Sequence, residues 1–336
     1  MTESVQAPPV VEVGPPPPFD PEVAAAVQVL NQFMPPDAFT LEAIPVLRQG
    51  RPGIEPPSNE ELARGGFFEV EERLVPGPEG APEVPVLICR PAAVGGDPVA
   101  TVYHIHGGGM VVGDSRTGLP EVLDWAQELG MAVVSVDYRL APETPHPGPV
   151  QDCYAGLVWT VEHAEELGVD PERIVIAGGS AGGGLAAAVA LLIRDRGGPQ
   201  LAGQLLECPM LDDRNNTVSA HQMAGLGVWD QASNHTGWTA LLGETCGGPE
   251  VSPYAAPARA TDLSGLPPTF IDVGSAETFR DEDVAYASRI WAAGGVAELH
   301  VWPGGCHGFD LFAPTAPISQ QAKAARLAWL RRLLES

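Results

Sequence analysis

Basic residues are scarce in this chain of 336 residues. Its 18 lysines and arginines stand against 43 aspartates and glutamates, which gives a formal net charge of −25, and Lys323 is the only lysine. A surface of this sign repels phosphate backbones and anionic lipid headgroups. We therefore expect neither nucleic acid nor a membrane as a partner.

Cysteine is also rare, and the five cysteines are scattered with no C-x-x-C spacing: Cys89, Cys153, Cys208, Cys246 and Cys306. This pattern argues against a disulfide scaffold and against a zinc site, and it fits a reducing cytoplasm. The sequence has no H-E-x-x-H motif, no apolar run of membrane-spanning length and no basic-then-apolar leader. We expect a cytoplasmic protein that needs no metal and no organic cofactor.

Short β-branched and apolar runs alternate with helical stretches from residue 67 onward. This pattern predicts an α/β fold with a mostly parallel eight-stranded sheet and helices on both faces. The first two runs flank a Pro/Gly-rich turn and should pair as an antiparallel edge. The expected strands are 67–74, 84–90, 99–104, 132–137, 174–177, 203–208, 269–273 and 297–302.

A G-x-S-x-G motif at 178–182 lies between the expected strand 174–177 and a helical run that extends to Arg194. Glycines allow a turn sharp enough to lift the hydroxyl of Ser180 clear of the carboxyl edge of the sheet. The N–H groups at the start of the helix would face the negative charge of an ester-hydrolysis intermediate. Ser180 is therefore the candidate nucleophile.

An HGGG string at 106–109 follows the expected strand 99–104. Glycine lets bare backbone approach a developing oxyanion, and such a string works with the N–H after the nucleophile, here that of Ala181. The alternative is a merely flexible glycine turn, which the neighbouring serine motif makes the weaker interpretation.

His307 lies in a glycine loop after the last expected strand, where a serine–acid–histidine order places the base. Three carboxylates near the strand 269–273 compete for the role of acid: Glu277, Asp281 and Asp272. Asp281 suits the first turn of the next helix, and Asp272 lies inside the strand. Glu277 is the preferred acid, and Asp281 is the main alternative.

These motifs, together with the DYRLAPE string at 137–143, resemble the bacterial hormone-sensitive-lipase family of α/β-hydrolase carboxylesterases over roughly residues 65–335. The resemblance implies that the N–H groups of Gly108, Gly109 and Ala181 form the oxyanion hole. Two positions depart from the family pattern, because Glu277 stands where aspartate is usual and Gly179 stands where aspartate is commonest. The DYRLAPE string is expected to be structural.

The resemblance also implies a helical cap over the serine. We expect core segments at 61–209 and 261–336, cap segments at 19–60 and 210–260, and a disordered or extended Pro-rich arm at 1–18. A cap would exclude water and shape an acyl pocket.

The expected function is a serine carboxylesterase for short- to medium-chain acyl esters, with a small-molecule ester as its substrate and a homodimer as a plausible assembly. Amidase or lactonase chemistry on the same triad, or an inactive ligand-binding protein of this fold, are the alternatives. A dinucleotide-binding oxidoreductase is a weaker alternative. The G-x-G-x-x-A match at 182–187 precedes Glu207 by the spacing that such a site requires, but the match lies in mid-chain.

Overall fold

A single mixed sheet organises the chain. The computed structural model describes residues 13–33, 38–49, 55–92 and 97–335. Its eight strands follow the order β1-β2-β4-β3-β5-β6-β7-β8, with only the β1–β2 and β2–β4 pairs antiparallel. They are β1 (Phe68–Val75), β2 (Val84–Pro91), β3 (Val99–Ile105), β4 (Ala132–Val136), β5 (Val169–Gly179), β6 (Gly203–Glu207), β7 (Thr269–Gly274) and β8 (Ala297–Trp302).

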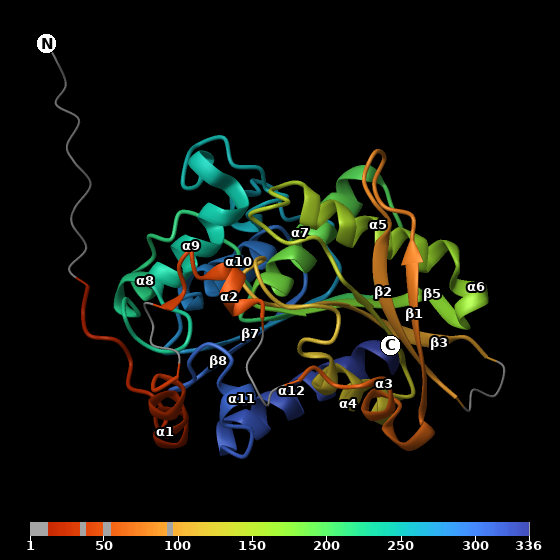
Figure 1. Cartoon of the computed structure of the whole chain (residues 1–336), viewed down its shortest axis with the longest axis horizontal. Coiled ribbons are helices and arrows are strands. Elements are labelled where there is room, and N and C mark those ends of the chain that lie inside the picture. The colour runs from red at the N-terminus through yellow and green to blue at the C-terminus, as the bar shows by residue number, and fades with distance from the viewer. Residues whose placement is uncertain (1–12, 34–37, 50–54, 93–96, 336) are drawn as a thin grey trace, which may run out of the picture.

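Helices cover both faces of the sheet (Figure 1). Each face has its own apolar core. On one side, α5 (Gly148–Glu162), α7 (Ala181–Arg196) and α10 (Arg280–Ala292) pack against the strands. On the other side lie α4 (Leu119–Leu129) and α12 (Pro317–Glu335). Because the central strands are buried on both faces, β4 is apolar except for Ser135, whereas β7 also contains the buried polar residues Thr269 and Asp272.

All eight predicted strands are present, and the first two pair antiparallel as expected. The largest difference is at β5, which begins at Val169 rather than at residue 174 because Val169 already pairs with Val99 before a break in register. The mostly parallel α/β architecture is therefore confirmed.

Two further helical segments lie beside the carboxyl ends of the strands (Figure 1). The first contains α1 (Pro21–Leu30) and α2 (Ile44–Leu47), and the second contains α8 (Val218–Gln222) and α9 (Gln231–Leu242). The rings of Phe39 and Trp229 join them edge to face at 4.7 Å. The predicted domain boundaries remain predictions, and most of the predicted arm at 1–18 lies outside the described residues.

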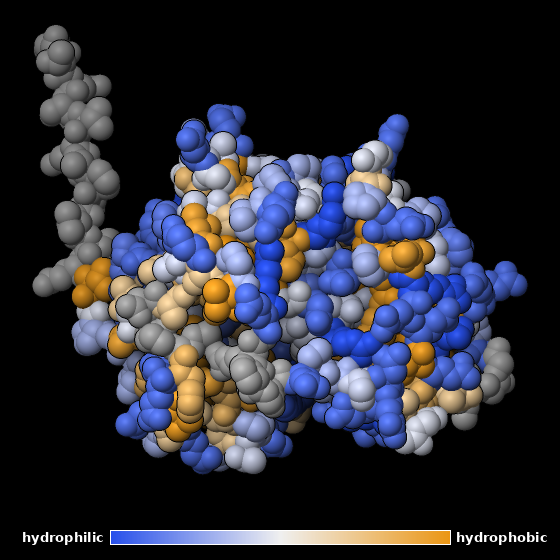
Figure 2. Space-filling view, viewed as in Figure 1, coloured by the Kyte–Doolittle hydropathy of each residue, from blue (hydrophilic) through white to orange (hydrophobic). Residues whose placement is uncertain are grey.

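The remaining short elements are α3 (Asn59–Leu62), η2 (Arg64–Gly66), α6 (Ala164–Leu167), η3 (Gly243–Thr245), η4 (Pro257–Arg259) and α11 (Phe309–Phe312). Hydrophilic side chains dominate the face shown in Figure 2, as the composition predicts. In the described part of the chain, no helix has the length and apolarity that crossing a bilayer requires.

Candidate active site

Ser180 lies in a sharp turn between β5 and α7. Its backbone has φ 58° and ψ −123°, a conformation that L-residues rarely adopt. The turn is possible because Gly182 has no side chain: a Cβ there would lie 2.0 Å from the carbonyl oxygen of Ile105. The sequence prediction of a glycine-dependent elbow is matched by this geometry.

The elbow is also held by hydrogen bonds on both sides of the serine. The Ser180 N–H donates to the Glu207 carbonyl at 2.7 Å, and the Ser180 carbonyl accepts from the Met210 N–H at 2.9 Å. Because both partners belong to β6 and the loop after it, the strand beside β5 fixes the strained backbone.

The HGGG loop lies next to this elbow. A Cβ on Gly107 would be 3.5 Å from the Ser180 Cβ, so the two backbones are nearly in contact. Gly108 and Gly109 have φ values of 109° and 61°, which favour glycine. No hydrogen bond of the described residues uses the N–H groups of Gly108, Gly109 or Ala181, so all three are available to a ligand.

The side chains of Tyr138 and His106 pack together beside the HGGG loop. The Tyr138 hydroxyl donates to the His106 carbonyl at 2.9 Å, and the two rings stack with centroids 4.2 Å apart. Burial lowers the pKa of His106 to about 4 and that of His104 to about 3, so both imidazoles are neutral near pH 7. Tyr138 thus has a structural contact, as expected for the DYRLAPE string.

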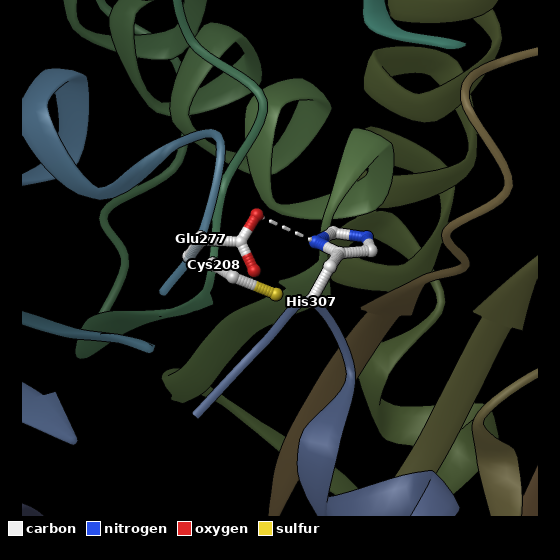
Figure 3. Close-up of side chains that lie close together, drawn as sticks. All are labelled: Cys208, Glu277 and His307. Carbon is white, nitrogen blue, oxygen red and sulfur yellow. Dashed lines mark hydrogen bonds and ion pairs between the residues drawn. The ribbon is translucent and has the colours of Figure 1, made fainter. Parts of the chain in front are cut away.

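His307 and Glu277 form a direct pair. The His307 Nδ1 lies 3.0 Å from Glu277 Oε1, and the glutamate side chain is fully buried (Figure 3). Ser180 and His307 line the same cavity. Within the described residues, no direct hydrogen bond joins their side chains; such contacts often tighten only when substrate binds.

The two competing carboxylates have other partners. Asp281 accepts from the Ser219 N–H at 2.8 Å and from Arg280 Nε at 2.8 Å. Asp272 accepts from Arg326 Nε at 2.9 Å and from Trp302 Nε1 at 3.0 Å. Glu277 is therefore the one of the three candidates that contacts His307.

The cavity that contains Ser180 and His307 measures about 400 Å³. Both extra helical segments contribute to its wall, through Phe39 and Leu47 from the first and Val228 and Trp229 from the second. Much of the wall is apolar, which suits a small, largely apolar ligand.

A buried ionic cluster also lines this cavity, and the sequence analysis missed it. Arg326 is 2% exposed and makes ion pairs with four carboxylates, those of Glu121, Glu207, Asp272 and Asp310. Burial raises the pKa of Glu207 well above its usual range, although Arg326 opposes this rise. The five cluster residues come from five separate elements (α4, β6, β7, α11 and α12), so no local motif indicates them.

Cys208 is a second residue that the sequence analysis did not connect with the site. It follows β6 directly and also lines the cavity. Figure 3 shows its sulfur directed toward the Glu277–His307 pair. Burial and the nearby Glu277 raise the pKa of its thiol well above the usual value, so the thiol is protonated near neutral pH.

Comparisons with known proteins agree with this geometry. A family model described as the α/β-hydrolase fold matches residues 102–311. The carboxylesterase NlhH of Mycobacterium tuberculosis is 38% identical over 288 residues, which cover 80% of this chain and 84% of that protein.

Solved structures extend the similarity to nearly the whole chain. A bacterial heroin esterase has a TM-score of 0.86 at 41% identity, covering 95% of this chain and 98% of that one. The esterase LipW from Mycobacterium marinum has a TM-score of 0.84 at 34% identity, with 96% and 99% covered. The chain belongs to the α/β-hydrolase fold family and is a carboxylesterase of its hormone-sensitive-lipase-like group.

Proposed function

We propose that this carboxylesterase works through a Ser180–His307–Glu277 triad, with the N–H groups of Gly108, Gly109 and Ala181 as its oxyanion hole. The observation that carries the proposal is the 3.0 Å bond from His307 Nδ1 to Glu277, in the cavity that exposes the Ser180 elbow. Three unused backbone donors beside the serine support the oxyanion assignment.

In this mechanism, Ser180 Oγ attacks the acyl carbonyl while His307 Nε2 accepts its proton. The three N–H groups stabilise the tetrahedral oxyanion, and loss of one such donor typically costs about 3 kcal/mol. His307 then protonates the departing alcohol and afterwards activates the water that releases the acid. Glu277 keeps the proton on Nδ1 and stabilises the charged imidazole.

The proposed substrates are esters with short to medium acyl chains. Support comes from the cavity volume of about 400 Å³ and from its apolar wall. A panel of aryl esters graded by acyl length tests this assignment. We expect kcat/KM to rise over short chains and to fall once the acyl group exceeds the cavity; a maximum at long chains would contradict it.

The nucleophile is tested with Ser180→Ala. Removing the hydroxyl should lower kcat by at least about 10⁴-fold, because no covalent acyl-enzyme can then form. A fluorophosphonate label should modify the parent protein and not the variant, and circular dichroism should remain unchanged. Activity near that of the parent would refute the role of Ser180.

The acid is tested by comparing Glu277→Gln with Asp281→Asn. The first variant should lower kcat about 10³- to 10⁴-fold, because the amide can impose the wrong imidazole tautomer. The second should leave kcat within about tenfold, because Asp281 binds Ser219 and Arg280 instead of His307. Collapse of activity in the second variant alone would transfer the role to Asp281.

A further inference from the structure

Three side chains that can ligate a metal ion lie close together, and one of them is His307, the proposed base. Cys208, Glu277 and His307 each offer one ligand atom, and the three atoms lie within 4.8 Å of one another. They come from the loops that follow β6, β7 and β8. In Figure 3 the sulfur is directed toward the carboxylate and the imidazole, so the three groups surround a common space.

One polar atom in this group has no partner. Glu277 is 1% exposed, and its Oε1 binds His307, but its Oε2 accepts no hydrogen bond from any described residue. A buried carboxylate oxygen without a donor or a cation is costly. Figure 3 places this second oxygen on the side of the Cys208 sulfur. The carboxylate therefore has a free coordination position that faces a thiol.

The backbone of Cys208 is held in an unusual conformation. Cys208 has φ 35°, and its N–H donates to the Asp272 carbonyl at 2.7 Å. A residue other than glycine keeps such a conformation only where its surroundings impose it. Cys208 and His307 also line the cavity, so an ion that enters the cavity can reach both.

We propose that Cys208 Sγ, the Glu277 carboxylate and His307 Nδ1 form an inhibitory binding site for Zn²⁺ or a similar thiophilic divalent cation. Sulfur, imidazole nitrogen and carboxylate oxygen are the ligands that zinc takes in proteins, usually in tetrahedral geometry. Three protein ligands leave the fourth position for water from the cavity. One thiolate and one carboxylate balance the two charges of the ion.

Binding requires a change in the protonation of two ligands. The Cys208 thiol releases its proton to solvent as sulfur bonds to the metal. The imidazole loses its proton from Nδ1 and takes one up at Nε2, so the neutral ring carries its proton on the side of Ser180. Such a ring cannot accept the serine proton, and hydrolysis stops; this consequence rests on the proposed function, whereas metal binding does not.

Metal binding is measured first on the Ser180→Ala protein, where activity plays no part. We expect calorimetry to find a tight Zn²⁺ site, and we expect Co²⁺ to give a thiolate-to-cobalt charge-transfer band. Cys208→Ser in this background should abolish the band and weaken Zn²⁺ binding by more than the roughly 100-fold that loss of an outer partner can cost. Cys246→Ser is the matched control, because that half-buried cysteine belongs to no such cluster of described residues.

Inhibition is then measured on the chain with Ser180 intact. Zn²⁺ should inhibit aryl-ester hydrolysis, and EDTA should reverse the inhibition. In Cys208→Ser, the inhibition constant for Zn²⁺ should rise by the same factor as the dissociation constant for Zn²⁺. Absence of the cobalt band in the parent chain would overturn the inference whatever the variants do. Equal inhibition of the Cys208→Ser and Cys246→Ser proteins would overturn it as well.

Discussion

At the scale of single residues, the serine motif depends on which of its positions have space for a side chain. Gly182 and Gly179 belong to the same motif, yet they have opposite surroundings. A Cβ on Gly182 would lie 2.0 Å from a backbone oxygen of β3, whereas a Cβ on Gly179 would meet nothing closer than 3.8 Å. The departure from the family at Gly179 is thus a position with space for a side chain, which explains why aspartate and glycine are both compatible with the elbow.

This contrast predicts different outcomes for two alanine substitutions. Gly182→Ala should destabilise the protein by about 3 kcal/mol or more, because α7 must move away from β3 and carry Ser180 with it. Gly179→Ala should change the free energy of unfolding by less than about 1 kcal/mol. Urea unfolding with parallel kcat measurements checks both, and comparable losses in the two variants would contradict the packing argument.

At the scale of elements, α10 does more than cover the sheet. Glu282 in its first turn is 3% exposed, and its Oε1 accepts from the N–H groups of Leu211 and Asp212 at 2.8 and 3.1 Å. Burial raises the pKa of Glu282 well above its usual range, which favours the neutral form of the carboxyl group. This contact joins the first turn of α10 to the loop that follows β6.

Two substitutions separate the hydrogen bonds of Glu282 from its charge. Glu282→Gln keeps an acceptor oxygen and should cost less than about 1 kcal/mol at pH 7. Glu282→Ala leaves two buried N–H groups without partners and should cost about 2–5 kcal/mol. Chemical denaturation of both proteins is the measurement; a glutamine variant as unstable as the alanine variant would show that the charged form matters.

The elements themselves were predictable because their signals are local. Short runs rich in β-branched and apolar residues, such as 174–177, favour the buried strands of a parallel sheet, and glycine-rich strings mark the turns that follow them. Chain order indicated His307, whereas the sequence only preferred Glu277 to Asp281 and Asp272 because of their places in the next helix and in the strand. The Arg326 cluster and the approach of Cys208 could not be predicted, because they join side chains that only the complete fold brings together. Likewise, the contact of Asp281 with Ser219 spans 62 residues.

At the scale of the whole molecule, the acidic composition extends into the interior. Arg326 is the buried cation shared by Glu121, Glu207, Asp272 and Asp310, and Lys323 adds a half-buried charge beside Glu121 at 3.4 Å. Burial raises the pKa values of Glu121 and Asp272 as well as that of Glu207. Without Arg326, these carboxyl groups could stay buried in the native state only if they bound protons.

Replacing Arg326 by methionine should therefore destabilise the fold by about 3–5 kcal/mol at pH 8. The variant's carboxyl groups have raised pKa values in the folded state, so that state binds more protons than the unfolded chain, and the deficit should shrink as the pH falls toward 5. Urea unfolding at the two pH values tests this sign. Arg331→Met is the control, since its ion pair with Glu128 is exposed and should be worth less than about 1 kcal/mol. A deficit that grows on acidification would contradict the account.

Glu207 makes two contacts that matter to the site and to the fold. Its backbone carbonyl holds the Ser180 N–H, and its side chain binds Arg326. Redesign of the acidic interior for thermal tolerance will thus affect turnover too, because the Glu207 carboxylate and the carbonyl that holds Ser180, the proposed nucleophile, belong to the same residue. Heat resistance and catalytic rate are not independently adjustable at this residue, and a directed-evolution campaign should sample it jointly with its arginine.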